Sequence, residues 1–262
     1  MSMSDRGVSR GMPARTFVLA TVVGLSVSLS AKPSAAQAPP PPGWFVATPY
    51  GWMAGIGGQV GIRNLLTNID VDFGDVVRHL RFAGMAAFDA RRDPLVMNAD
   101  VVYVSLGGSK AFAIRGASGD VTFDLREAIV QGVVGYTPLN TRLLTVDVLV
   151  GARYWDLSTE IGLDPANRDS RARSGSVDWV DATGGARVRF NAANNVHLVA
   201  DGDVGGGGSR NTWRAMGTAT YDLSRRYGLM AGYKYLSVDY DRNDFLFDTH
   251  TNGFLVGVTF TF

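Results

Sequence analysis

Apolar and polar side chains alternate with a period of two along most of the chain. In the segment 144–154 the even-numbered positions are small, apolar or aromatic, whereas the odd-numbered ones include Asp147 and Arg153. The same alternation recurs over 180–190 and over 195–223. This pattern is typical of a β-strand whose two faces meet different environments. We therefore expect an all-β chain.

Ten such segments can be counted, each near or above the ~9–11 residues that a tilted strand needs to cross a bilayer. They cover 44–57, 82–91, 95–106, 120–137, 142–160, 177–190, 196–205, 211–223, 227–240 and 246–262. Their connections alternate between tight turns and mostly longer polar segments, as periplasmic turns and extracellular loops would. The tight turns are 91–94, 138–141, 191–195 and 223–226; the longer connections are 58–81, 107–119, 161–176 and 241–245, with 205–209 a short exception. The pattern predicts one closed antiparallel transmembrane β-barrel over 44–262, of about ten strands, with eight as the alternative.

Composition excludes several other classes of protein. A mean hydropathy of +0.04 and the lack of a long apolar run beyond the N-terminal segment argue against a bundle of membrane helices. The 32 glycines fit closely packed, curved strands. With no cysteine, the chain cannot form a disulfide scaffold or a thiol active site.

The first 36 residues resemble a secretory signal peptide. Arg6, Arg10 and Arg15 precede an apolar stretch over 16–31, and Ser34-Ala35-Ala36 supplies small residues for cleavage. Cleavage after Ala38 and an uncleaved anchor are the alternatives. Residues 37–43 then form a proline-rich leader. Removing residues 1–36 takes away four Lys/Arg and one Asp, so the net charge falls from +1 to −2 and offers no basic surplus for nucleic acid.

Charged side chains on the polar faces of these strands are the main candidate site. An Arg or Lys on the lipid side near the bilayer midplane costs roughly 2–4 kcal/mol, so the charges are expected to point into the lumen. The candidates are Asp89, Asp100, Glu127, Asp147, Arg153, Asp181, Arg187, Arg189, Asp201, Asp203, Arg214 and Lys234.

Opposite charges in a narrow lumen are expected to pair, because an isolated charge away from water is very costly. We favour a salt-bridged plug, since about eight strands leave room for little beyond side chains, whereas water-filled porins use about 16–18. A narrow channel for small polar solutes is the alternative.

The segment 72–81 interrupts the strand pattern and predicts a short helix in the first long loop. Phe73, Val76, Val77 and Leu80 fall at i, i+3, i+4 and i+7, after Asp72 as a helix start. We expect this helix to lie across or within the outer mouth as a partial cap; a structured loop packed on the rim is the alternative.

Aromatic side chains along the strands are expected to form belts at the membrane interfaces. These residues are Trp44, Tyr50, Trp52, Tyr154, Trp179, Trp213, Tyr221, Tyr227, Tyr233 and Tyr235.

Catalytic and metal chemistry find little support in the residue types present. The three histidines are His79, His197 and His250, and only His250 has acidic residues near it at the outer end, without a serine motif. The segment 239–250 begins like a calcium loop but has Asp244 where glycine is needed and His250 where glutamate is needed. We expect no catalytic residue, no metal and no cofactor, and regard an outer-membrane hydrolase as the third alternative.

The last strand carries an apolar series at every second position up to the terminal residue: Phe254, Val256, Val258, Phe260 and Phe262. Together with the signal peptide and the alternation of turns and loops over 43–262, it resembles the small Gram-negative outer-membrane β-barrels, of the opacity-protein and outer membrane protein A type. That resemblance implies delivery by the barrel-assembly machinery and residence among lipid and lipopolysaccharide in the outer membrane. We expect a monomer with a structural or surface-interaction role.

Overall fold

The computed structural model describes residues 43–62, 65–114, 117–165, 171–242 and 245–262. The predicted signal peptide and residues 37–42 of the leader lie outside these ranges. Among the described residues, no helix is both long enough and apolar enough to cross a membrane.

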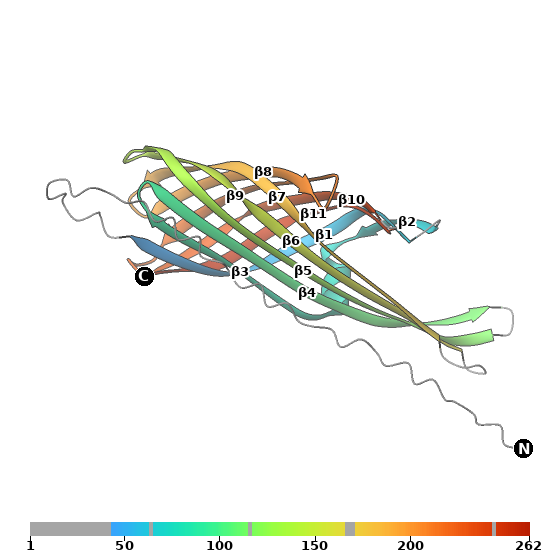
Figure 1. The fold of residues 1–262 in the computed structure, drawn as a ribbon. Coiled ribbons are helices and arrows are strands. Elements are labelled where there is room, and N and C mark those ends of the chain that lie inside the picture. Colours follow the sequence, from blue (N-terminus) through green and yellow to red (C-terminus); the bar gives the residue numbers. More distant parts are fainter. Residues whose placement is uncertain (1–42, 63–64, 115–116, 166–170, 243–244) are drawn as a thin grey trace, which may run out of the picture. The chain divides into compact units, whose positions relative to one another are not determined.

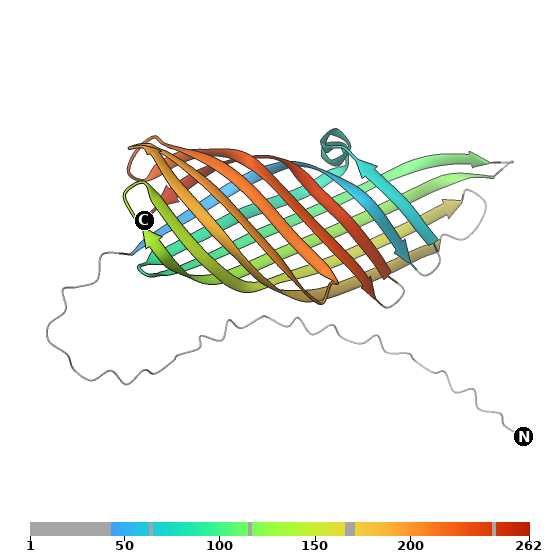
Figure 2. The same cartoon turned by 90° about the horizontal axis from the view of Figure 1, so that it is seen from above.

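Ten antiparallel strands close into a barrel within the described part of the chain (Figure 1, Figure 2). Each strand pairs with its neighbour in sequence, and the last pairs with the first, from Val46↔Thr261 to Ile62↔Phe245. The predicted fold and strand number are confirmed. The wall strands are β1 (Trp44–Ile62), β3 (Leu80–Arg92), β4 (Leu95–Ile114), β5 (Ala117–Asn140), β6 (Leu144–Pro165), β7 (Arg171–Ala193), β8 (Val196–Gly207), β9 (Asn211–Asp222), β10 (Tyr227–Arg242) and β11 (Phe245–Thr261).

The first long connection contains a further strand, β2 (Leu65–Val71), and a helix, α1 (Phe73–His79). β1 pairs with β3 along its first residues and with β2 along its last ones, so β2 continues the wall beyond the start of β3. Asp72 caps the helix by accepting a hydrogen bond from the backbone N–H of Asp75 at 2.8 Å. The predicted short helix is therefore confirmed, and it ends where β3 begins.

Much of what we expected as loop is strand. The connections predicted over 107–119 and 161–176 are mostly ladder, since β4–β5 pairing reaches Ile114↔Ala117 and β6–β7 pairing reaches Leu163↔Arg171. Outside a bilayer both faces of a strand meet water, so the apolar–polar alternation disappears while the backbone hydrogen bonds continue. Figure 1 shows β4 to β7 extending past the rest of the wall. We call this extension the arm, its side of the barrel the arm end, and the opposite side, with the four tight turns, the turn end.

The outer surface of the wall is apolar. Val204 on β8, Phe254 on β11 and Val150 on β6 are 65%, 66% and 58% exposed. Such a contiguous apolar surface is the one that a barrel presents to lipid. Tyr154, Trp213, Tyr221, Tyr227 and Tyr233 share this outer surface.

The expected aromatic belts are wrong for four residues. Trp52 and Trp179 are buried in the lumen, 8% and 6% exposed. Trp44 and Tyr50 line a cavity inside the barrel. In all four, the odd or even position along the strand decides whether the side chain points into the lumen or toward lipid, and the aromatic character does not.

Candidate functional site

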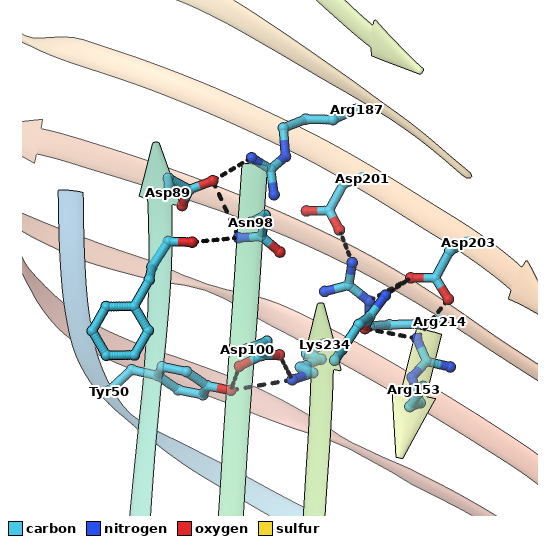
Figure 3. A network of polar contacts seen from close by, with 12 residues as sticks. Tyr50, Asp89, Asn98, Asp100, Arg153, Arg187, Asp201, Asp203, Arg214 and Lys234 are labelled. Carbon is cyan, nitrogen blue, oxygen red and sulfur yellow. Dashed lines mark hydrogen bonds and ion pairs between the residues drawn. The ribbon is translucent and has the colours of Figure 1, made fainter. Parts of the chain in front are cut away.

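The lumen is filled by side chains in two layers. Nearer the turn end, charged and amide side chains form a polar network (Figure 3). Above it toward the arm end, aromatic and aliphatic side chains form a buried cluster.

Asp203 on β8 joins side chains from β5, β6 and β9 in the polar network. Its carboxylate lies 2.5 Å from Nη2 of Arg153 and 2.8 Å from Nε of Arg214, and it accepts from the amide of Gln131 at 3.0 Å. Arg214 also reaches Asp201 at 2.6 Å. Both arginines and both aspartates are under 9% exposed. The acceptors on Asp203 and the donors around it therefore satisfy one another.

A second group crosses the lumen from β10 to β4 and β1. Nζ of Lys234 lies 2.5 Å from Asp100 and 3.1 Å from the hydroxyl of Tyr50, and that hydroxyl donates to Asp100 at 2.6 Å. The Lys234 ammonium also lies 4.9 Å from the centre of the Trp52 ring. This contact joins the polar network to the aromatic layer above it.

Two further ion pairs lie closer to the turn end. Arg187 Nη1 lies 2.5 Å from Asp89, which also accepts from the Asn98 amide. Arg91 Nη2 lies 2.7 Å from both oxygens of Asp147. These pairs link β7 to β3, and β3 to β6, across the barrel.

Nine of the twelve predicted lumen residues take part in these ion pairs. The other three have different surroundings: Glu127 faces inward with no hydrogen bond or ion pair to the described residues, Asp181 accepts from neutral donors, and Arg189 lies over an aromatic ring. Sequence reasoning missed Arg91, because we placed it in a turn although it shares the parity of Asp89. Tyr50 and Gln131 were missed as well, since a neutral side chain gives no charge signal.

The aromatic layer was not predicted. The ring of Trp179 stacks on Trp155 at 5.5 Å and on Tyr240 at 4.2 Å, and Phe247 lies 6.5 Å away. The buried cluster spans strands on opposite sides of the barrel: Trp52, Ala54, Val102, Ile129, Trp155, Leu157, Trp179, Leu236, Val238, Tyr240, Phe247 and Leu255.

The β8–β9 turn is attached to this layer. The backbone N–H of Ser209 donates to Asp181 at 2.7 Å, and the indole N–H of Trp179 donates to the same carboxylate at 3.0 Å. The N–H of Gly208 donates to the carbonyl of Val180 at 2.9 Å. The turn thus packs against β7, with Ser209 only 2% exposed.

A cavity of about 360 Å³ lies between the polar network and the turn end. Its wall contains charged, hydroxyl and apolar side chains from eight strands: Trp44, Val46, Thr48, Tyr50, Ala87, Asp89, Asn98, Asp100, Arg187, Arg189, His197, Val199, Asp201, Arg214, Met216, Thr218, Thr220, Asp222, Met230, Leu255, Thr259 and Thr261.

The predicted cap residues lie on or next to α1, which packs against β1 and β4. None of the helix residues is buried, and Phe73, Val77 and Leu80 are 39%, 49% and 39% exposed. The ring of His79 lies 5.4 Å from that of Phe123 on β5. A cap over the mouth stays a prediction.

The histidines are dispersed. Both ring nitrogens of His197 already have partners, Asn191 and Asp222, each at 2.8 Å. His250 stacks on Tyr235, at 6.0 Å between ring centres. Among the described residues there is no cluster of three or more His, Cys, Asp or Glu side chains that could hold a metal ion.

Solved outer-membrane barrels are similar to this fold. The outer membrane protease OmpT from Escherichia coli matches with a TM-score of 0.54 at 10% identity, over 85% of this chain and 97% of that one. The translocator domain of the autotransporter NalP from Neisseria meningitidis matches with 0.43 at 12%, over 83% and 88%. Ail, the attachment invasion locus protein of Yersinia pestis, matches with 0.33 at 12%, over 84% and 98%. No protein-family model and no curated protein sequence matches the chain.

Proposed function

We propose that this chain, which has the fold of the Gram-negative outer-membrane β-barrels and lies in that membrane, is a non-conducting barrel that presents its arm at the cell surface. The single observation that carries the proposal is the filling of the lumen by the polar network and by the aromatic cluster above it. Ions would have to break buried pairs in the first layer and cross an apolar layer in the second. Both steps are costly, because charges inside a low-dielectric interior lose their hydration.

The arm supports the surface-interaction part of the proposal. β4, β5, β6 and β7 have 20, 24, 22 and 23 residues, against 12 each in β8 and β9. Ten additional residues of strand correspond to roughly 33 Å of chain. With the turn end in the periplasm, such strands would reach beyond the lipid toward the headgroups of lipopolysaccharide or another surface.

Catalysis is not part of the proposal. His197 has both nitrogens engaged, and His250 stacks on a tyrosine, so neither is paired with a nucleophile among the described residues. A monomer is proposed, with lipid and lipopolysaccharide as its surroundings and the barrel-assembly machinery as its partner during biogenesis.

Single-channel recording in planar bilayers tests the closed lumen. The refolded protein is expected to give no steady ohmic current. If it gives one, and neutralising Asp147 or Arg187 changes that current, the lumen is instead a narrow channel for small polar solutes.

The arm is tested by shortening it. A variant that lacks residues 111–120 joins Lys110 to Val121, which are register partners, through an Asn-Gly turn. In lipid nanodiscs the shortened barrel should keep its shape but bind immobilised lipopolysaccharide more weakly than the full chain. Equal binding by both would remove the arm from the proposal.

A further inference from the structure

Arg189 makes no ion pair within 4 Å with a carboxylate of the described residues, although Asp89 and Asp147 attract it from farther away. The other two arginines that line the turn-end cavity are paired, Arg187 with Asp89 and Arg214 with Asp201 and Asp203. Arg189 instead lies over the ring of Trp44 at 5.0 Å, and its Nε is buried without a hydrogen-bond acceptor. A buried N–H of a charged group that lacks an acceptor is costly, so the protein itself leaves this guanidinium incompletely satisfied.

The carboxylates of the cavity do not supply that acceptor. Each of the four has another basic group within 4 Å: Asp89 has Arg187, Asp100 has Lys234, Asp201 has Arg214 and Asp222 has His197. Asp89 also attracts Arg189 from a longer distance, and the oxygens of Asp201 make no hydrogen bond to the described residues. The Nε of Arg187, a residue only 4% exposed, is also buried without an acceptor. Arg187 and Arg189 stand two residues apart on β7 and both line the cavity, so two unsatisfied donors lie close to each other.

The rest of the cavity wall indicates which other groups a negatively charged ligand would carry. Apolar side chains of Val46, Val199, Met216, Met230 and Leu255 contribute to it. The volume of about 360 Å³ lies within the range of small-molecule sites. An inorganic anion would leave the apolar part of the wall without contacts, whereas an organic acid would use both parts.

We propose that this cavity binds a small organic carboxylate, whose charge Arg189 receives while its apolar body packs on the valines and methionines. Arginine suits this role because its planar fork matches the two oxygens of a carboxylate. Trp44 holds the guanidinium in place through its ring face. The site is independent of whether the lumen conducts.

The test is a titration of 4-fluorobenzoate into the refolded protein in nanodiscs, followed by fluorine NMR. Saturable binding is expected, and Arg189→Gln should weaken it tenfold or more, since charge-assisted hydrogen bonds are lost. The matched control is Arg225→Gln, which removes the same charge from an exposed turn at the same end and should leave the affinity unchanged. Neutral 4-fluorobenzyl alcohol and inorganic phosphate should both bind much more weakly than the carboxylate.

A second measurement does not depend on the variant folding. Binding to the native state raises the urea midpoint of the wild-type barrel, so 4-fluorobenzoate should raise it and the alcohol should not. The proposal is overturned by a lack of saturable binding, by equal affinity in Arg189→Gln, or by an alcohol or phosphate that binds as tightly as the carboxylate.

Discussion

At the scale of the residue, Asp203 is a buried carboxylate with three partners in the polar network. It joins Arg153, Arg214 and Gln131, all of them buried. Breaking a buried pair costs more than the pair contributes, because the remaining charge stays in the interior without compensation.

Asp203→Asn should therefore lower the free energy of unfolding by about 3–5 kcal/mol. The measurement is the urea midpoint of the refolded barrel, followed by tryptophan fluorescence. Asp241→Asn is the control, because Asp241 pairs with Arg210 at the surface, where side chains are 41% and 60% exposed, and such a pair contributes under about 1 kcal/mol. Equal losses in both variants would contradict the central position of Asp203.

Residue parity accounts for what could and could not be predicted of the site. Asp147, Arg153 and Arg187 could be placed in the lumen because a charge on the lipid side is prohibitive. Trp155 lies two residues from Arg153, and Trp179 lies two residues from Asp181, so each ring shares the inward face with a charge. An apolar ring is tolerated in lipid as well as in the lumen, however, so the residue type alone does not show which way the ring points. Which charges pair depends on the register and on the distance across the barrel, and neither can be read from a single strand.

At the scale of the element, the β8–β9 turn and β7 are closely matched. A Cβ at Gly208 would lie 2.7 Å from Cβ of Trp179 and 2.8 Å from the carbonyl oxygen of Val180. The turn could not keep its position against the aromatic layer with a larger residue there.

Gly208→Ala should destabilise the barrel by about 1–3 kcal/mol, as overpacking typically does. Gly217→Ala is the matched control, because a Cβ at Gly217 meets nothing within 4 Å. The control should change stability by less than about 0.5 kcal/mol. Thermal unfolding of both variants in the same detergent compares them; equal melting temperatures would show that the turn can move.

The last strand ends in a defined contact with the first. The ring of Phe262 lies 5.8 Å from that of Phe45, and the N–H of Phe262 donates to the carbonyl of Phe45 at 2.9 Å. Deleting Phe262 should reduce the amount of barrel that resists dissociation on an unboiled detergent gel of the outer membrane. Phe262→Tyr, which keeps the ring, should assemble normally. Normal assembly of the deletion would contradict a role for Phe254, Val256, Val258, Phe260 and Phe262 as an assembly signal.

The ends of the elements were the least predictable part of the fold. The period-two pattern located the ten wall strands because one face of each strand meets apolar lipid and the other meets the lumen. The pattern stops where both faces of a strand meet water. β4 to β7 continue past that point, and β2 adds to β1. Helix α1 was visible because its i, i+3, i+4, i+7 pattern differs from a period of two.

At the scale of the whole molecule, the aromatic layer should control permeability. Replacing both Trp155 and Trp179 with Ala removes two stacked rings from the lumen. If the refolded double variant conducts where the wild type does not, the layer is the barrier. Trp213→Ala is the control, since that ring stacks on Tyr235 away from this cluster. Its loss should produce no ionic current across the bilayer. No current through the double variant would place the barrier in the polar network.

The pairing of β11 with β1 has a consequence for the order of biogenesis. Every other wall pairing joins neighbours along the chain, whereas this seam joins positions 46–62 to positions 245–261. β11 must therefore be synthesised before the barrel can close on β1. Until then the intermediate has two unpaired edge strands, which would form hydrogen bonds with any other available strand. We expect a chaperone or assembly factor to shield both edges for that interval, and a stop codon anywhere before β11 to leave an open sheet.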